Sequence, residues 1–415
     1  MDNLSHSVVG LAAAELIHRS LPSELDAQCH RLRRRLLLVS CWLASNFPDL
    51  DIVLTPLLPA PLGYLLHHRG HTHTLLYALP QALLIWAMIW LFWPSARRLL
   101  KGNSAARKGF VLTLIVGFGL HMLMDYLNSY GIHPFHPYDS RWLFGDMVFI
   151  LEPVFWVAFG IPMAMTVQRR WPRAFFVTAL IGLPLFFTLR DFLLWASFGF
   201  LIVVALVLGM IQHRAGARGT SALILAAVVS IAFVGVQRFA SSQARLAVTQ
   251  TLKAGNPESR LLDSAMTPFP TNPLCWTFVL IESNESAGTY RLRRGLLSLA
   301  PETLPVANCP AGLSERPAQK EVAPAIAFLF EHEGDLKTLR ALKKENCYFE
   351  AWLRFARAPL LNGTYAWDLR FSSTPRGNFT TMNLEEFKNR ECSRYIPGWD
   401  FPRADLLTPS APNAR

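Results

Sequence analysis

Long apolar runs alternate with short polar segments through the first 239 residues of the chain. A helix needs about 20 apolar residues to cross the hydrocarbon core of a bilayer. The run at residues 174–189 is short and contains Pro184, which makes it the weakest candidate. We expect a polytopic α-helical membrane bundle from the runs Leu75–Trp93, Phe110–Leu127, Met147–Val167, Ala174–Leu189, Phe192–Ile211 and Ser221–Val236.

Two shorter apolar runs come first, Val8–Ile17 and Leu36–Leu43. Each is too short to span a bilayer alone, so we expect half-helices or helices packed inside the bundle. A signal peptide carries positive charge before its apolar run and a small-residue cleavage site after it. Here Asp2 precedes the first run and Arg19 follows it. We therefore expect this segment to be retained.

The pattern changes after residue 239. Cys275–Ser283 and Thr289–Leu299 predict strands, because they are rich in β-branched and aromatic residues. Thr364–Ser372 alternates apolar and polar positions, which predicts a half-buried strand, and Asp335–Phe355 has helical spacing with an ambiguous middle. Residues 1–239 should therefore form a membrane domain, and residues 240–415 a small α+β or mostly β domain.

Composition agrees with this division. Hydrophobic residues make up 52% of the chain and charged residues 17%, against about 25% charged in a soluble domain. These values exclude a disordered protein, argue against a soluble one and make the lipid bilayer a partner. The net charge of +11 could indicate nucleic-acid binding. No basic run is interleaved with stacking aromatic residues, so we expect no nucleic-acid partner.

Basic residues gather in every second loop of the bundle, at residues 97–108, 169–173 and 214–218. Cytoplasmic loops carry such an excess of lysine and arginine. The basic loops should therefore face the cytoplasm, and the last span should place residues 240–415 outside. This predicts a multi-pass protein of the bacterial inner membrane with an extracytoplasmic C-terminal domain.

The cysteines provide an independent argument for that orientation. Four lie in the C-terminal part, an even number that suits two disulfides with three possible connectivities; four buried free thiols are the alternative. Cys29 and Cys41 lie near the basic side and should be reduced. The four candidates for pairing are Cys275, Cys309, Cys347 and Cys392.

Ionisable residues in or beside membrane spans are costly and usually functional. Ten of the twelve histidines precede residue 137. Polar residues form four clusters, at Asn3–His6, Asn46–Asp51, His67–Thr74 and His121–Gly131. By the predicted topology all four lie toward the outer side, so we expect them to meet there.

These clusters have the chemistry of a metal site. His121 and Asp125 are four residues apart, so on a helix they share a face and can bind one ion. Nitrogen and oxygen ligands without a nearby thiolate favour a catalytic Zn²⁺ or Mn²⁺ over a structural cysteine–zinc site. Several carboxylates and histidines could hold more than one ion. Arg69 could bind an anionic substrate oxygen, and a non-ligating carboxylate could act as a general base.

Taken singly, most of these residues have an ordinary structural explanation. Asp49 could cap a helix, His67 and His71 could be interfacial, and Asp125 could hydrogen-bond within the bundle. Four polar clusters on one side of an apolar bundle are harder to explain without a functional site.

The residue order of these clusters resembles that of the YdjM (DUF457) family of inner-membrane proteins, which are described as metal-dependent hydrolases. The resemblance covers about residues 1–155, in the segments Asn3–Ser7, Phe47–Asp51, His68–Thr74 and His121–Gly131. Gly145–Pro153 is also similar, although Glu152 stands where the family usually carries aspartate. Two later segments, at residues 268–276 and 367–371, resemble the tail of longer members.

The family is thought to be remotely similar to zinc-dependent phospholipase C and P1-type nucleases, which cleave phosphoesters. That similarity implies His6, Asp49, His73, His121 and Asp125 as metal ligands. His68, from the histidine cluster, completes the expected metal set. Catalytic roles are expected for Asp51, Arg69 and Glu152.

The leading hypothesis is therefore a membrane-bound metal-dependent hydrolase acting on a phosphoester, as a small molecule or a lipid, at the outer face. The alternative is a metal- or proton-coupled transporter. Transporter sites usually lie near the midplane between repeats, whereas these clusters lie at span ends. A membrane-anchored scaffold with a degenerate site is a third hypothesis, and the near-complete ligand set argues against it.

Overall fold

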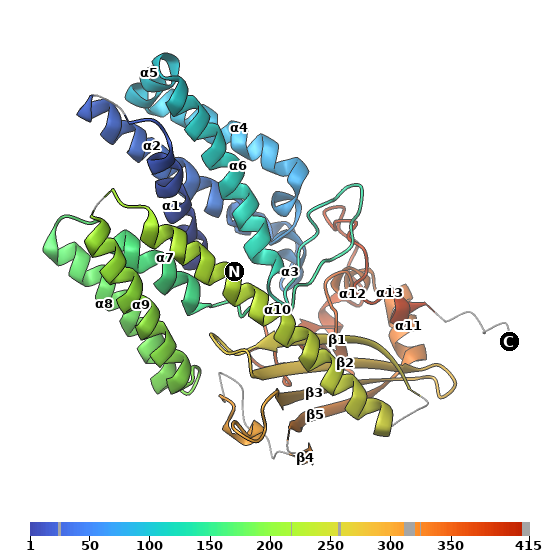
Figure 1. Cartoon of the computed structure of the whole chain (residues 1–415). Coiled ribbons are helices and arrows are strands. Elements are labelled where there is room, and N and C mark those ends of the chain that lie inside the picture. Colours follow the sequence, from blue (N-terminus) through green and yellow to red (C-terminus); the bar gives the residue numbers. More distant parts are fainter. Residues whose placement is uncertain (24–25, 217, 256–258, 311–319, 324, 409–415) are drawn as a thin grey trace.

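The computed structural model describes residues 1–23, 26–216, 218–255, 259–310, 320–323 and 325–408. Helices from the first part of the chain form a bundle, and a sheet-containing domain packs against one end of it (Figure 1). The helices are α1 (Asn3–Ser20), α2 (Ala27–Asn46), α3 (Leu62–His67), α4 (Leu75–Phe92), α5 (Pro94–Gly102), α6 (Ser104–Tyr126), α7 (Pro153–Met165), α8 (Arg170–Leu189), α9 (Trp195–Ala215) and α10 (Ser221–Gly255), with 3-10 segments η1 (Phe47–Leu57) and η2 (His71–His73).

Among the described residues, six helical segments are long and apolar enough to cross a membrane, which confirms the predicted polytopic bundle. Two boundaries differ from the expectation. Leu36–Leu43 is part of a 31-residue helical segment, Ala27–Leu57, and is not too short to span. The run Met147–Val167 was expected to span the membrane but is not one of these six segments. It becomes helical only at Pro153, because Glu152 caps α7 by accepting a hydrogen bond from the Val154 N–H, and α7 has only 13 residues.

Small residues allow α1, α2 and α6 to pack closely. A Cβ atom added at Gly10 would lie 2.3 Å from Ser45 Oγ, and one at Gly117 would lie 2.6 Å from the Ala44 Cβ. Close backbone approach of this kind is a common way to associate membrane helices. It brings the start of α1 and the ends of α2 and α6 to the same end of the bundle.

The C-terminal part contains two antiparallel sheets, as expected for an α+β domain. The predicted strands at residues 275–283 and 289–299 are confirmed as β2 and β3, whereas the strand predicted over Thr364–Ser372 ends at Asp368. One sheet has the order β1-β2-β3-β5-β4 and the other β6-β7-β8. Their bounds are β1 (Arg260–Pro268), β2 (Cys275–Asn284), β3 (Thr289–Ser298), β4 (Lys320–Ala323), β5 (Ile326–Asp335), β6 (Pro359–Leu361), β7 (Tyr365–Asp368) and β8 (Met382–Asn383).

Three short helices complete this domain: α11 (Leu336–Glu345), α12 (Cys347–Leu353) and α13 (Ala404–Leu407). The helical region predicted over residues 335–355 is divided at Asn346. Its side chain accepts hydrogen bonds from the Tyr348 and Phe349 N–H groups and so caps α12.

The larger sheet is buried on both faces. Alternate residues of a strand point to opposite faces: Phe278 and Leu280 pack against Ala244 of α10, whereas Val279 and Ile281 belong to the core formed with α11 and α12. Helix α10 passes beyond the predicted span end at residue 236 and lies along this sheet (Figure 1). One helix thus connects the bundle to the domain.

Two disulfides fix the domain, Cys275–Cys309 and Cys347–Cys392. They use the four predicted cysteines and select one of the three connectivities. Cys29 and Cys41 take part in neither.

Peptide mapping of alkylated, unreduced protein is expected to recover these two cross-linked pairs. The reason is their location in a domain predicted to face an oxidising compartment. Reduced protein provides the control, because the same peptides should then separate. Recovery of four alkylated thiols from freshly prepared protein would contradict both the pairing and the exported location.

Several hydrogen bonds tie the domain to the bundle. The Trp142 indole donates to the Arg354 carbonyl at 2.7 Å, the Trp399 indole donates to the Leu66 carbonyl at 2.8 Å, and Arg370 Nη1 donates to the Ser129 carbonyl at 2.7 Å. Leucines of α3 share a core with the domain. The domain is therefore held over the end of the bundle that carries the polar clusters.

A buried ionic group lies at the centre of this junction. Arg357 donates to both carboxylate oxygens of Asp146 at 2.9 Å and to Asp263 Oδ2 at 2.7 Å. Arg245 of α10 also contacts Asp146. Asp146 itself adopts a left-handed backbone conformation with φ of 53°, which a non-glycine residue keeps only when its surroundings hold it there.

Candidate metal centre

Four side chains offer ligand atoms that all lie within 4.8 Å of one another: Asp49 of η1, His73 of η2, and His121 and Asp125 of α6. The two α6 residues are one turn apart, as their spacing predicts, and His121 Nε2 lies 3.5 Å from Asp125 Oδ2. His73 Nε2 lies 3.3 Å from Asp49 Oδ1 and 3.2 Å from Asp125 Oδ2. This group could hold a metal ion.

The hydrogen bonds at the outer nitrogens define how the two imidazoles face the group. His121 Nδ1 donates to the Ser45 carbonyl at 2.7 Å, and His73 Nδ1 lies 3.2 Å from Asp51 Oδ2. With a proton on each Nδ1, both Nε2 atoms carry lone pairs, and these atoms are only 2.9 Å apart. Two lone pairs and two carboxylates in such proximity repel one another unless a cation lies between them.

His73 is also surrounded by carboxylates, which favour a positive charge either on its own ring or on an ion beside it. This histidine lies between two candidate spans, in η2. Burial alone would lower the pKa of His73, but hydrogen bonds that its ring donates to Asp125, Asp49 and Asp51 raise this pKa to about 10. The surrounding carboxylates therefore favour a positive charge at the centre of this group.

Three cationic or polar groups surround Asp125 Oδ1. His6 Nε2 lies 3.3 Å from Asp125 Oδ1, and its ring stacks on His121 with 4.1 Å between centroids. Arg69 Nη2 contacts the same oxygen at 2.9 Å, and the backbone amine of Met1 also contacts it. Asp125 Oδ2 faces His73 Nε2 at 3.2 Å and His121 Nε2 at 3.5 Å, so it points into the candidate group and is available to a metal.

Arg69 is held in an unusual conformation. Its φ of 57° is left-handed, and such strain is typical of functional sites. Its N–H donates to Asp51 Oδ2 at 2.9 Å, and its guanidinium lies over the Tyr130 ring at 4.7 Å. The guanidinium also neutralises Asp125, and its Nε atom has no hydrogen-bond partner among the described residues. Its binding of a substrate oxygen stays a prediction.

Asp51 is buried and is not one of the four convergent residues. It lies 2.9 Å from His68 Nδ1, accepts from Thr72 Oγ1 at 2.7 Å, and contacts His73. A carboxylate that fixes the outer nitrogen of a ligating histidine is a common second layer of metal sites. His68 is thereby placed beside the group rather than in it, with 14% of its side chain exposed.

Glu152 lies in a different environment. Its carboxylate accepts from the Thr271 N–H at 3.0 Å and from Thr271 Oγ1 at 2.7 Å, in addition to capping α7. These contacts link the bundle to the C-terminal domain and do not join Glu152 to the four convergent residues. The sequence shows the carboxylate but not its partner, which is 119 residues away.

A second imidazole cluster surrounds Trp399 and was not predicted as a unit. The Trp399 ring centroid lies 4.0 Å from that of His133 and 4.7 Å from those of His71 and His136. Burial, together with His73, His136 and His71, keeps the pKa of His133 well below its usual range. The excess of histidines before residue 137 was the available signal, but the central tryptophan comes from the far end of the chain.

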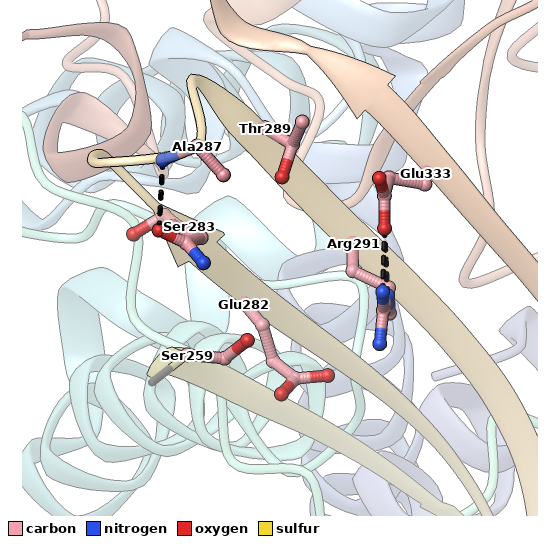
Figure 2. Close-up of a pocket in the computed structure, with 8 residues that line it drawn as sticks. Ser259, Glu282, Ser283, Ala287, Thr289, Arg291 and Glu333 are labelled. Carbon is pink, nitrogen blue, oxygen red and sulfur yellow. Dashed lines mark hydrogen bonds and ion pairs between the residues drawn. The ribbon is translucent and has the colours of Figure 1, made fainter. Parts of the chain in front are cut away.

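A small pocket also lies on the C-terminal sheet, between the ends of β2 and β3 (Figure 2). Its volume is about 140 Å³, and its arginine, Arg291, is already paired with Glu333 at 2.5 Å. Glu282 adds a further negative charge to the lining. None of its lining residues belongs to the four convergent residues, so we assign this pocket no part in the candidate metal centre.

Comparison with known proteins finds a family model that is similar to the part of the chain carrying the polar clusters. Residues 1–193 match the model described as YdjM inner membrane protein, which confirms the resemblance seen in the motifs. "Uncharacterized protein YfhP" of Bacillus subtilis (strain 168) is 24% identical over 191 residues, which is 46% of this chain and 54% of that protein. The chain thus aligns with about half the length of this relative. No solved structure matches the chain.

Proposed function

We propose that this protein, with its YdjM-type N-terminal half, is a membrane-bound metal-dependent hydrolase whose ligands are Asp49, His73, His121 and Asp125. The observation that carries the proposal is the pair of imidazole Nε2 atoms 2.9 Å apart between two carboxylates. Nitrogen and oxygen ligands of this kind suit Zn²⁺, and Mn²⁺ is the second choice.

The protein's own residues have distinct tasks in this site. Asp51 and the Ser45 carbonyl hold the two imidazoles in their ligating tautomers. A divalent ion would supply Lewis-acid activation of water and of a phosphoryl oxygen. His68, backed by Asp51 and partly exposed, can hold or release a proton at its Nε2 atom.

The surroundings of Asp49 favour a phosphoester carried by a lipid. The side chain of Asp49 is 10% exposed, whereas the apolar η1 residues Leu50 and Val53 are 54% and 71% exposed. Leu75 and Leu79 at the start of α4 are also exposed. Apolar side chains exposed beside a buried polar site are suited to the membrane interior, so we infer that the substrate enters from the bilayer.

The outer face of the membrane is the proposed location of the site. The disulfide-bonded domain packs on the same end of the bundle as the metal centre. Disulfides persist in oxidising compartments, and the basic loops lie between the opposite ends of the spans.

Metal analysis of the purified protein, followed by a screen of phosphoester substrates, tests this function. We expect at least about one zinc or manganese ion per chain. We also expect hydrolysis of a phosphoester that a chelator abolishes and added metal restores. Asp49→Asn provides the inactive control. Bound metal with vectorial metal flux into liposomes and no hydrolysis would support a transporter instead, and a metal-free protein would contradict both.

A further inference from the structure

A cavity between the bundle and the C-terminal domain suggests a second binding site, separate from the candidate metal centre. It has a volume of about 520 Å³ and lies where the bundle meets the C-terminal domain. Aromatic residues, including Trp142, Phe144 and Phe401, form part of its wall. Its charged lining consists of one carboxylate, Asp263, and five arginines: Arg141, Arg238, Arg245, Arg357 and Arg403.

Three of these arginines are held in the wall of the cavity by buried or partly buried carboxylates. Arg357 and Arg245 share Asp146, and Arg357 and Arg403 share Asp263, with Arg403 Nη1 at 3.0 Å. Arg403 also reaches Asp405 at 3.3 Å. Their guanidinium groups are thus fixed in place by the fold.

The two remaining arginines stand at the rim. Arg141 pairs with Asp139 at 2.7 Å, but its side chain is 74% exposed, so the pair is weak. Arg238 is exposed and makes no hydrogen bond or ion pair with any residue that the structure describes. The five arginines are thus matched by four carboxylates, Asp139, Asp146, Asp263 and Asp405, and the charge of Arg238 is left unpaired among the described residues.

The rim of the cavity lies beside residues of the kind found at a membrane surface. Arg238 lies in α10 between Val236 and Phe239, which are 52% and 66% exposed along a candidate span. Phe135 and Tyr138, in the loop that carries Arg141, are exposed aromatic residues, of the kind enriched at membrane–water interfaces. Arginines at this level reach the headgroup layer while their stems cover apolar surface.

We propose that this cavity, termed the arginine pocket, binds a phosphate group, presented by the headgroup of an anionic phospholipid. Guanidinium groups match the geometry of phosphate and can bind it bidentately. The exposed apolar residues beside Arg238 would then receive an acyl chain. This site is independent of the proposed hydrolase activity, because its lining includes none of the four proposed ligands Asp49, His73, His121 and Asp125.

Native mass spectrometry of the detergent-purified full chain tests the proposal, with phosphatidylglycerol and phosphatidylcholine as probes. We expect tighter binding of phosphatidylglycerol, weakened about tenfold in the double variant Arg141→Gln/Arg238→Gln. These residues make few structural contacts, so the variant should fold. Arg376→Gln, exposed on the domain, and Arg214→Gln, at the end of α9, are matched controls and should bind as the wild type does.

Inorganic phosphate distinguishes the two sources of the ligand. Displacement of phosphatidylglycerol by phosphate supports a shared phosphate site in the arginine pocket. Binding of phosphate alone, sensitive to the double variant, would retain the anion site and replace the lipid by a soluble phosphate compound. Equal binding of both lipids, or phosphatidylglycerol binding that the double variant leaves unchanged, would overturn the proposal.

Discussion

Asp49→Asn protein should lose its metal while remaining folded and inserted in the membrane. Asparagine keeps the size of the side chain but removes the charge, so the group of two imidazoles and two carboxylates loses a ligand. Mutation of a residue that only orients a metal ligand typically costs about 10–100-fold in metal affinity. Loss of a ligand itself should therefore cost at least about 100-fold. Elemental analysis and zinc competition titration of purified protein measure it.

Two further ligand variants, Asp125→Asn and His121→Ala, should lose metal in the same way. Asp125 is also the partner of the buried Arg69, so its replacement carries a folding cost that Asp49→Asn avoids. His213→Ala, at the exposed end of α9, and His332→Ala, in β5, are the controls and should retain metal. Wild-type metal content in Asp49→Asn and His121→Ala proteins would show that the ligand set is wrong.

The second large effect is expected at the junction between the two halves. Arg357→Met should destabilise the docking of the C-terminal domain, because it leaves the buried Asp146 and the largely buried Asp263 without their central partner. Removing one member of a buried ion pair typically costs about 3–5 kcal/mol. Thermal unfolding of the detergent-solubilised protein should show this loss, together with faster proteolytic release of the domain.

Arg376→Met is the matched control, because Arg376 is exposed on the same domain. The double variant Arg357→Met/Asp146→Asn should be less destabilised than the sum of the two single changes, since it no longer leaves the Asp146 charge buried opposite an apolar group. A protein that unfolds at the wild-type temperature after Arg357→Met would contradict the role of this ion group.

The bundle and the His121–Asp125 pair were predictable from local signals in the sequence, whereas Asp49 and His73 were added to the candidate group by the family resemblance. Length and hydropathy define the spans, and the i, i+4 spacing of His121 and Asp125 places both on one face of α6. Hydropathy does not detect helix caps, which is why the predicted start of the span at residue 147 missed the cap at Glu152 and the proline after it. The continuation of α10 was missed because its later part packs on a sheet and becomes more polar.

The roles of the surrounding residues could not be predicted, because they depend on contacts between distant segments. Arg357 and Asp146 are separated by 211 residues, and the indole of Trp399 reaches the Leu66 carbonyl across 333. Glu152 and Asp51 illustrate the same limit within the predicted site. Sequence identified both carboxylates, but only the fold shows that one binds Thr271 and the other orients His73.

The continuity of α10 has a mechanical consequence. Its 35 residues make a rod about 50 Å long, whereas the hydrocarbon core is about 30 Å thick. The surplus length is clamped to the sheet by Ala244 and Val248, with no described break at the membrane surface. A change in bilayer thickness or lateral tension that tilts the membrane-embedded part of α10 should therefore also move the attached sheet. This movement would act on the Arg357–Asp146 contact between the domain and the bundle.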